Sequence, residues 1–282
     1  MCRLFGFRSV IPSQVHRSLM AADNALGTQS EQHPDGWGVA HYVNGTPHVT
    51  RAPSTALNDA IFHRLSGIVA SETVLAHVRK ATIGPKTVLN CHPFQYGRWV
   101  FAHNGEIRRF AQHKDALSSE VAPRLRRYIL GDTDSEVLFF LLLTELARHG
   151  ELASRLGIDE LMQAIRTTVH TVRALCDEPH DPSPLTFIVT DGVTMAATHG
   201  GKDLYWSTHK SRCADRDDCA HLAPECEAPA AAGGRVNHLV FSSEVIHSDN
   251  VFTPLVAGDV IGVDWRMRLH RAHTEHRSLP VA

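Results

Sequence analysis

The second residue of the chain is a cysteine that can become an N-terminal nucleophile. Removal of Met1 would leave Cys2 with a thiol and a free α-amino group on the same residue. A thiol attacks as the thiolate, and its ordinary pKa near 8.5 keeps it mostly protonated at neutral pH, so it needs a base. An α-amino group, with a pKa of about 7.7 to 8.0, can be that base. The position therefore predicts nucleophilic catalysis, although a single cysteine is more often an ordinary buried thiol.

Polar residues that could assist such a nucleophile recur in short blocks. The blocks are His33-Pro34-Asp35-Gly36-Trp37-Gly38, His77-Val78-Arg79-Lys80-Ala81-Thr82, His92-Pro93-Phe94, Phe101-Ala102-His103-Asn104-Gly105-Glu106, Asp132-Thr133-Asp134-Ser135-Glu136 and, late in the chain, Phe241-Ser242-Ser243-Glu244. Taken singly, each has an ordinary explanation: Arg79 as a surface arginine, Asn104-Gly105 as a hairpin turn, Asp134 as a helix cap. Asp35-Gly36 can simply form the turn that presents Trp37. Only the combination with Cys2 points to a shared chemistry.

Together with Met-Cys-Arg-Leu-Phe-Gly at residues 1–6, these blocks resemble the class II glutamine amidotransferases of the N-terminal nucleophile hydrolase superfamily, most closely their small stand-alone members. The resemblance implies an α+β fold, a four-layer αββα sandwich of two mostly antiparallel sheets between helices. It implies that Cys2 attacks the γ-amide carbonyl of glutamine, that ammonia leaves, and that water hydrolyses the γ-glutamyl thioester to glutamate. It implies no cofactor.

The resemblance also assigns the remaining roles residue by residue. The side-chain amide of Asn104 and the backbone N–H of Gly105 would stabilise the tetrahedral oxyanion. Arg79, assisted by Thr82, would bind the substrate α-carboxylate, for which a planar guanidinium is well shaped. Asp134 would pair with the α-ammonium, joined by the carbonyl of Gly105.

Four histidines in these blocks offer a different base. A Cys–His pair could use His33, His77, His92 or His103, but the N-terminal amine already fills that role, so we expect structural histidines.

Two residues depart from the family pattern. Cys91 stands where a small or polar residue is expected, and Lys80 follows Arg79 where larger amidotransferases often place an aromatic residue. These departures leave the shape of the pocket, and therefore the substrate, open.

Composition excludes several classes of protein. The 282 residues contain 43% apolar residues, and 28 Lys and Arg stand against 30 Asp and Glu, for a formal charge of −2. Such a chain has no basic field for nucleic acid or an anionic membrane. No apolar run approaches the roughly 20 residues of a membrane span, and the start lacks the regions of a secretory signal. We expect a cytoplasmic protein whose six cysteines are free thiols.

Hydrophobic patterns predict strands early, helices in the middle and strands late. A hairpin is expected at 37–42 and 46–50 around Asn44-Gly45. Further strands are expected at 73–79 and 98–103, helices from Thr133 or Asp134 to Gly150 and at 159–175, and later strands within 185–192, 194–201, 204–209, 236–244 and 259–272. Elements segregated in this way favour α+β layers over a parallel βαβ repeat.

The chain is expected to form a single domain over residues 2–272, followed by a flexible tail at 273–282. An irregular, cysteine-rich excursion interrupts it at 211–235. Cys213, Cys219 and Cys226 suggest a structural zinc site, which His209 or His221 would complete, although the spacings of five and six residues exceed those of most zinc knuckles.

Three functions remain open on the sequence. The first is a stand-alone amidotransferase of the glutaminase type, working with a separate ammonia-accepting subunit. The second is a hydrolase of another γ-glutamyl amide, similar to the enzyme of ergothioneine biosynthesis or to the glutathione-degrading subunit of yeast. The third is a catalytically silent binding or regulatory module, against which the intact Cys2 and the full set of glutamate-binding residues argue.

Overall fold

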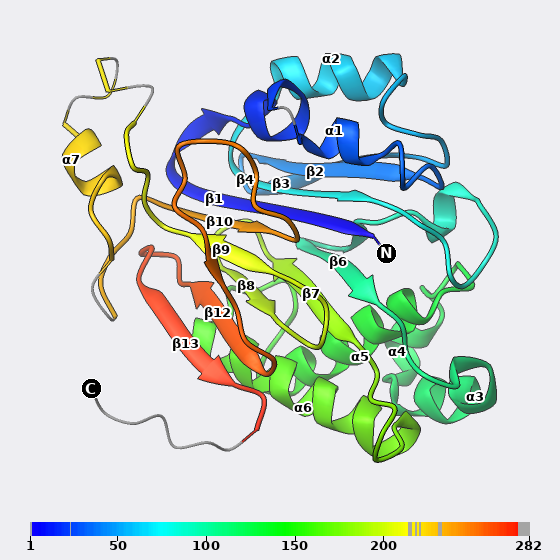
Figure 1. Ribbon diagram of the computed structural model, residues 1–282. Coiled ribbons are helices and arrows are strands. Elements are labelled where there is room, and N and C mark those ends of the chain that lie inside the picture. The colour runs from blue at the N-terminus through cyan, green and yellow to red at the C-terminus, as the bar shows by residue number, and fades with distance from the viewer. Residues whose placement is uncertain are drawn as a thin grey trace.

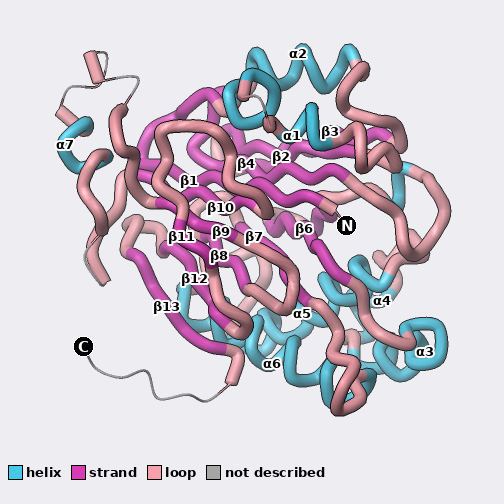
Figure 2. Tube along the Cα trace, viewed as in Figure 1, coloured by secondary structure: helices cyan, strands magenta, loops and turns pink. Residues whose placement is uncertain are grey.

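The chain folds into four layers, with two β-sheets stacked between two layers of helices. The computed structural model describes residues 2–22, 24–213, 216–217, 219, 221–230 and 233–275. Figure 1 shows α5 (Asp134–His149) and α6 (Ile158–Cys176) against one sheet, with α1 (Leu26–Gln29) and α2 (Ala60–Ile68) against the other. The tube in Figure 2 shows the strands of both sheets between these helices. The expected αββα sandwich is confirmed.

The strands form one seven-stranded and one six-stranded sheet. In spatial order the first contains β11 (Thr253–Pro254), β9 (Tyr205–Ser207), β10 (His238–Ser242), β1 (Arg3–Gln14), β4 (Ala70–Val78), β2 (Trp37–Val43) and β3 (Thr46–Ala52). The second contains β13 (Leu269–His273), β12 (Asp259–Val263), β8 (Met195–Thr198), β7 (Leu185–Thr190), β6 (Trp99–Gly105) and β5 (Phe94–Tyr96). The strand pairs of the described residues are antiparallel.

Five further helical segments are described. They are η1 (Arg17–Ala21), η2 (Val88–Asn90), α3 (Phe110–Glu120), α4 (Pro123–Arg126) and α7 (Ala223–Cys226).

The hydrophobic core occupies the three spaces between these layers. Leu4, Ile188 and Phe241 are fully buried between the two sheets, and Phe101 stacks on Phe139 beneath α5 with 5.2 Å between ring centroids. On the outer face of the first sheet, Trp37 packs edge-on against Phe62 of α2. Burial of both faces of each sheet makes the strands rigid supports for the loops at their ends.

Most predicted elements are confirmed. The hairpin turns at Asn44 and Gly45, whose φ values are 51° and 76°. Helix α5 begins after Thr133, whose side chain accepts a hydrogen bond from the N–H of Glu136, as an N-cap does. Helix α6 spans one residue more at each end than predicted.

The sequence patterns failed at β1 and at α2 and α3. Gly6 and Pro12 break the apolar pattern of β1, yet β1 is a central strand between β4 and β10. A Cβ on Gly6 would lie 3.1 Å from Ile188 in the opposite sheet, so the glycine permits close packing of the sheets. Helices α2 and α3 each bury only two residues, which leaves little periodicity to detect.

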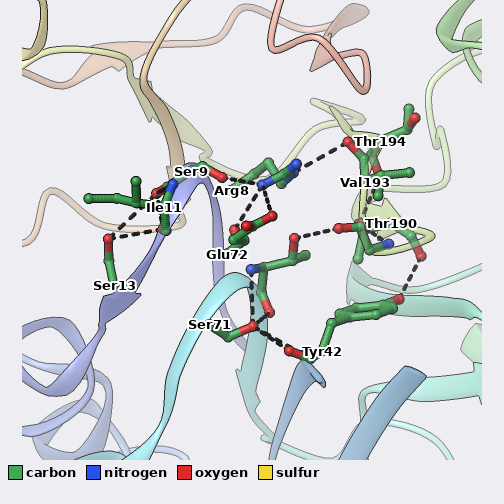
Figure 3. Close-up of polar contacts among 12 residues, drawn as sticks. Arg8, Ser9, Ile11, Ser13, Tyr42, Ser71, Glu72, Thr190, Val193 and Thr194 are labelled. Carbon is green, nitrogen blue, oxygen red and sulfur yellow. Dashed lines mark hydrogen bonds and ion pairs between the residues drawn. The ribbon is translucent and has the colours of Figure 1, made fainter. Parts of the chain in front are cut away.

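A polar network joins the two sheets at the end of β4 away from Arg79 (Figure 3). The Arg8 guanidinium lies 3.3 Å from the Glu72 carboxylate and donates to the carbonyl of Val193. The Tyr42 hydroxyl donates to the carbonyl of Thr190 in the second sheet. Arg8, Tyr42 and Thr190 are buried, and their contacts link residues of the first sheet to the second sheet and its β7–β8 turn, so the network fixes how one sheet sits on the other.

The late part of the chain bears on the expected boundaries. Within 211–235 the structure describes turns, the four-residue α7 and little else. Strand β13 includes His273, so packed structure continues past residue 272, while residues 276–282 lie outside the described part. None of the described helices is both long and apolar enough to cross a bilayer.

Candidate active site

Strand β1 places Cys2 beside the loop that follows β4. Arg3 pairs with Val78 in the antiparallel register, so Cys2 lies opposite Arg79. The half-buried Cys2 Sγ accepts a hydrogen bond from the Lys80 backbone N–H at 3.3 Å and lies 3.4 Å from the Lys80 carbonyl oxygen. In Figure 1 the start of β1 lies beside β6, which carries Asn104.

The environment of Cys2 raises the pKa of its thiol. Burial raises its pKa, while the Lys80 N–H and the positive charge of Arg79 act in the opposite direction, and the Asp134 carboxylate raises it further. Arg79 and Asp134 therefore both lie within electrostatic reach of the sulfur. A thiol of raised pKa needs a base to become a nucleophile at neutral pH.

Arg79 is a buried cation whose guanidinium contacts the loop between β4 and η2, residues 79–87, called here the Arg79 loop. Its side chain is only 3% exposed, and its guanidinium donates to the carbonyls of Ile83 at 2.8 Å and Pro85 at 3.2 Å. No carboxylate of the described residues forms an ion pair with it. A buried charge without a counter-ion favours an anionic ligand.

Asp134 provides the opposite charge at the first turn of α5. It is 3% exposed, and its two oxygens accept from the backbone N–H groups of Ile107 at 2.6 Å and Ser135 at 2.8 Å. Burial raises the pKa of this carboxyl to about 6, although these hydrogen bonds oppose the shift. No cation of the described residues pairs with it, so a substrate ammonium would relieve the unfavourable burial of its charge.

The residues expected to form the oxyanion hole stand at the end of β6. Asn104 is 4% exposed and pairs with Thr186 across the sheet, and its side-chain amide forms no hydrogen bond with another described residue. Gly105 follows; a Cβ there would lie 1.8 Å from the carbonyl oxygen of Pro184. Only glycine fits this close approach of two backbones.

Hydrogen bonds join the end of β6 to Asp134. The Ile107 N–H binds Asp134, and Ser135 Oγ lies 2.8 Å from Nδ1 of His103. Both Arg79 and Asp134 act electrostatically on the Cys2 sulfur, so the structure brings these three residues together. Thr82 lies in the Arg79 loop but is exposed, and its hydroxyl contacts no hydrogen-bond partner among the described residues.

The four histidines are buried below this site. His103 Nε2 lies 3.2 Å from the Pro184 carbonyl, and the rings of His77 and His92 are 4.3 Å apart. Burial lowers the pKa of His77 to about 3 and that of His103 to about 4. His33 Nδ1 lies 2.6 Å from the Gln29 carbonyl. The lowered pKa of His77 and His103 fits the structural role expected for them, because a group with such a pKa is a weak base at neutral pH.

Two positioning residues were missed by the sequence analysis. Asn90 is fully buried; its Nδ2 donates to Pro85 of the Arg79 loop, while its Oδ1 accepts from the N–H of Asp132 before α5. Asp35 accepts from the Ala81 N–H at 2.8 Å and lies 2.5 Å from Lys86. In the sequence Asp35 lies within the block at residues 33–38, whereas Asn90 lies two residues before the block at 92–94, and neither position reveals its hydrogen-bond partners.

Replacing Asp35 with alanine should lower kcat/KM by about tenfold to a hundredfold, mainly through KM. The variant leaves the half-buried Ala81 N–H without its acceptor, at about 1 to 3 kcal/mol, and loosens the Arg79 loop. Asp35→Asn keeps an acceptor oxygen and should recover most of the loss. Steady-state kinetics of both variants test this; an equal loss in the two would mean that the charge, not the hydrogen bond, positions the loop.

The structure bears on the unexpected cysteine at position 91 and on the zinc site suggested for the later cysteines. Cys91 is a fully buried thiol, with Sγ 3.3 Å from the Thr87 carbonyl, and a Cβ on Gly36 would lie 2.6 Å from it. Cys213, Cys219 and Cys226 line a cavity of about 640 Å³. Among the described residues, however, no three His, Cys, Asp or Glu side chains are placed to hold a metal, so the geometry does not support the zinc alternative.

The chain is similar to several known proteins in sequence. It is 32% identical over 225 residues to the probable glutamine amidotransferase DUG3 of Saccharomyces cerevisiae, which covers 70% of this chain and 63% of that protein. It is 32% identical over 121 residues to the gamma-glutamyl-hercynylcysteine sulfoxide hydrolase of Mycobacterium tuberculosis, covering 39% of this chain and 51% of that protein. The match therefore spans less than two thirds of either relative.

Solved structures share the fold, and a family model covers most of the chain. A glutamine aminotransferase class-II domain protein from Silicibacter pomeroyi has a TM-score of 0.62 at 22% identity, covering 96% of this chain and 99% of that one. The glutamine phosphoribosylpyrophosphate amidotransferase of B. subtilis has a TM-score of 0.62 at 15% identity, covering 98% and 50%. The model of the class-II glutamine amidotransferases matches residues 1–212, which include Cys2, Arg79, Asn104 and Asp134, and the chain belongs to that family.

Proposed function

We propose that this chain hydrolyses the γ-amide of glutamine through a thioester on Cys2 and releases glutamate and ammonia. The observation that carries the proposal is the position of the Cys2 thiol against the backbone of Lys80, within electrostatic reach of one buried cation, Arg79, and one buried anion, Asp134. Glutamine carries the two complementary charges on its α-carbon.

The substrate would bind through these charges. Its α-carboxylate would accept from the Arg79 guanidinium, which is held in place by the carbonyls of Ile83 and Pro85. Its α-ammonium would pair with Asp134 and donate to the Gly105 carbonyl. The γ-amide would then lie over the sulfur, with its oxygen toward Asn104.

The chemistry would proceed in two steps. The α-amino group of Cys2, exposed by removal of Met1, takes the thiol proton, and the sulfur attacks the γ-carbonyl carbon. Asn104 and the Gly105 N–H stabilise the oxyanion, the C–N bond breaks, and the amine passes the proton to the leaving ammonia. Water then attacks the thioester, releases glutamate and restores the thiol.

The first test is covalent capture of the nucleophile. We expect a glutamine-mimicking diazo ketone to add one label per chain on the peptide that begins with Cys2, and glutamate to slow the labelling. Intact mass before labelling should show that Met1 is absent. Labelling at another cysteine, with none at Cys2, would overturn the proposal.

A second candidate is a hydrolase of a larger γ-glutamyl amide. It is favoured by the similarity to the mycobacterial hydrolase, whose name describes a γ-glutamyl conjugate. The two candidates share the glutamyl half of the site and differ only in the leaving group. If ammonia is released, a separate acceptor subunit would consume it. We place the activity in the cytoplasm, which the six free cysteines support.

A further inference from the structure

The main chain of β1 just after Cys2 is held by Ser243, which follows the last residue of β10. Ser242 pairs with Phe5 in the antiparallel register, and one residue further along Ser243 contacts Leu4. The Leu4 N–H donates to Ser243 Oγ at 2.9 Å, and the Ser243 N–H donates to the Leu4 carbonyl at 3.1 Å. Leu4 and Ser243 are both buried, so water does not compete for these hydrogen bonds. The chain two residues after the nucleophile therefore has a fixed path.

Glu244, the next residue, brings a carboxylate to the first residue of β1. It forms an ion pair with Arg3, whose guanidinium also donates to the carbonyl of Cys2 at 3.4 Å. The Arg3 side chain is 18% exposed and that of Glu244 is 36% exposed, so solvent shields the pair only in part. A cation and its carboxylate therefore lie directly beside the residue that would supply both the nucleophile and the base.

Cations outnumber anions around the Cys2 α-amino group in the described part of the chain. The charged or titratable groups on the surrounding elements are Arg3 of β1, His33 in the loop before β2, Arg79 and Lys80 after β4, Asp134 of α5 and Glu244 after β10. A neighbouring cation favours the neutral form of an amine and lowers its pKa, whereas a carboxylate acts in the opposite direction. Without Glu244, Arg3 would add an uncompensated positive charge next to the base.

We propose that Ser243 and Glu244 are positioning residues for the N-terminal nucleophile. Ser243 fixes the path of the main chain, and Glu244 holds Arg3 and offsets its charge, so that the α-amino group of Cys2 stays basic enough to take the thiol proton. Both residues lie outside residues 1–212, the part that the family model matches, and both act through β1 rather than on the substrate. The inference rests on the proposed function and adds residues that support its base.

The test of Glu244 is the pH dependence of kcat/KM for glutamine in three variants. Glu244→Gln leaves the charge of Arg3 uncompensated, which lowers the pKa of the amine and should move the limb between pH 8 and 6 about half a unit to lower pH. Arg3→Gln leaves the carboxylate unpaired and should move it about half a unit to higher pH. The double variant should return to the wild-type midpoint, and 0.5 M salt should reduce both shifts because partly exposed charges are screened.

The test of Ser243 separates kcat from KM. Ser243→Ala removes the acceptor of the buried Leu4 N–H and should lower kcat about tenfold, because the nucleophile is displaced, while KM changes less than twofold. Arg79 and Asp134, which would bind the substrate, are untouched. Ser243→Thr keeps the hydroxyl and should recover most of kcat, and neither variant should move the pH limb.

Glu145→Gln is the matched control for Glu244, because it removes a carboxylate that pairs with Arg148 at 3.1 Å on α5. It should leave the pH profile unchanged. Labelling of Cys2 by the diazo ketone over the same pH range measures the midpoint independently of turnover. Shifts in one direction in both single variants, or no shift in either, would overturn the role of Glu244, and wild-type kcat in Ser243→Ala would overturn that of Ser243.

These outcomes are distinguishable from failure of the proposed function. If either role is overturned while glutamine turnover still depends on Cys2, the thioester mechanism stands and the support from β10 does not. Absence of Cys2-dependent turnover of glutamine in the wild-type chain would overturn both.

Discussion

Inserting one alanine between Met1 and Cys2 is expected to lower kcat for glutamate release by about 10²- to 10⁴-fold, the usual contribution of a positioned general base. Methionine is removed ahead of alanine, so the mature chain would start Ala-Cys and its amine would be displaced by one residue. The thiol would remain against Lys80, but burial has raised its pKa and nothing would take its proton. The measurement is steady-state kcat beside intact mass.

The Cys2→Ala variant is the companion to the insertion. It should release glutamate at no more than background, because no thioester can form. It should still bind glutamate, which isothermal calorimetry would show, since Arg79 and Asp134 are untouched. Full activity of the insertion variant would show that a group other than the α-amino group is the base, and full activity of Cys2→Ala would remove the thioester from the mechanism.

Replacing Asp134 with asparagine is expected to lower kcat/KM by about 10²- to 10³-fold, because a substrate ammonium would be left buried without its counter-ion, at about 3 to 5 kcal/mol. The pH dependence of kcat/KM is a more specific test of Asp134 than the loss of activity. The carboxyl has a pKa of about 6, so in wild type it becomes protonated, and unable to pair, as the pH falls through 6. The α-amine of Cys2 also loses its function as a base when protonated, near pH 8.

The logarithm of wild-type kcat/KM should therefore fall with a slope of one between pH 8 and 6 and a slope of two below pH 6. In Asp134→Asn the slope should stay at one. The variant should unfold at no lower temperature than wild type at pH 7.5 without ligand. At that pH the carboxylate is ionised, and its raised pKa costs about 3 kcal/mol of stability, whereas a buried N–H that loses its acceptor costs about 1 to 3 kcal/mol. A slope of two in the variant would assign the second proton to another group.

Helices and hairpins that carry their own signals were predictable from the chain alone. Thr133, Glu136 and Gly150 mark both ends of α5, and Asn44-Gly45 marks the first hairpin, because caps and turns depend on residues close in sequence. Strand β1 was not predictable in this way. Its place at the centre of a sheet depends on β4, β10 and the close approach of Ile188 at Gly6, which lie far away in the chain.

For the candidate site, too, some features are predictable from the sequence and others are not. The residue types of Cys2, Arg79, Asn104 and Asp134 are visible in the sequence because nucleophile, cation, amide donor and anion are chemical identities that each residue carries with it. The electrostatic states of these residues are not visible in the sequence. Whether Arg79 lacks a counter-ion, or Asp134 has a pKa near 6, depends on burial, on the loop carbonyl of Ile83 that accepts from Arg79, and on the Ile107 N–H that donates to Asp134. Only the tertiary structure decides these, because solvent exclusion and unpaired charge are properties of an assembled site.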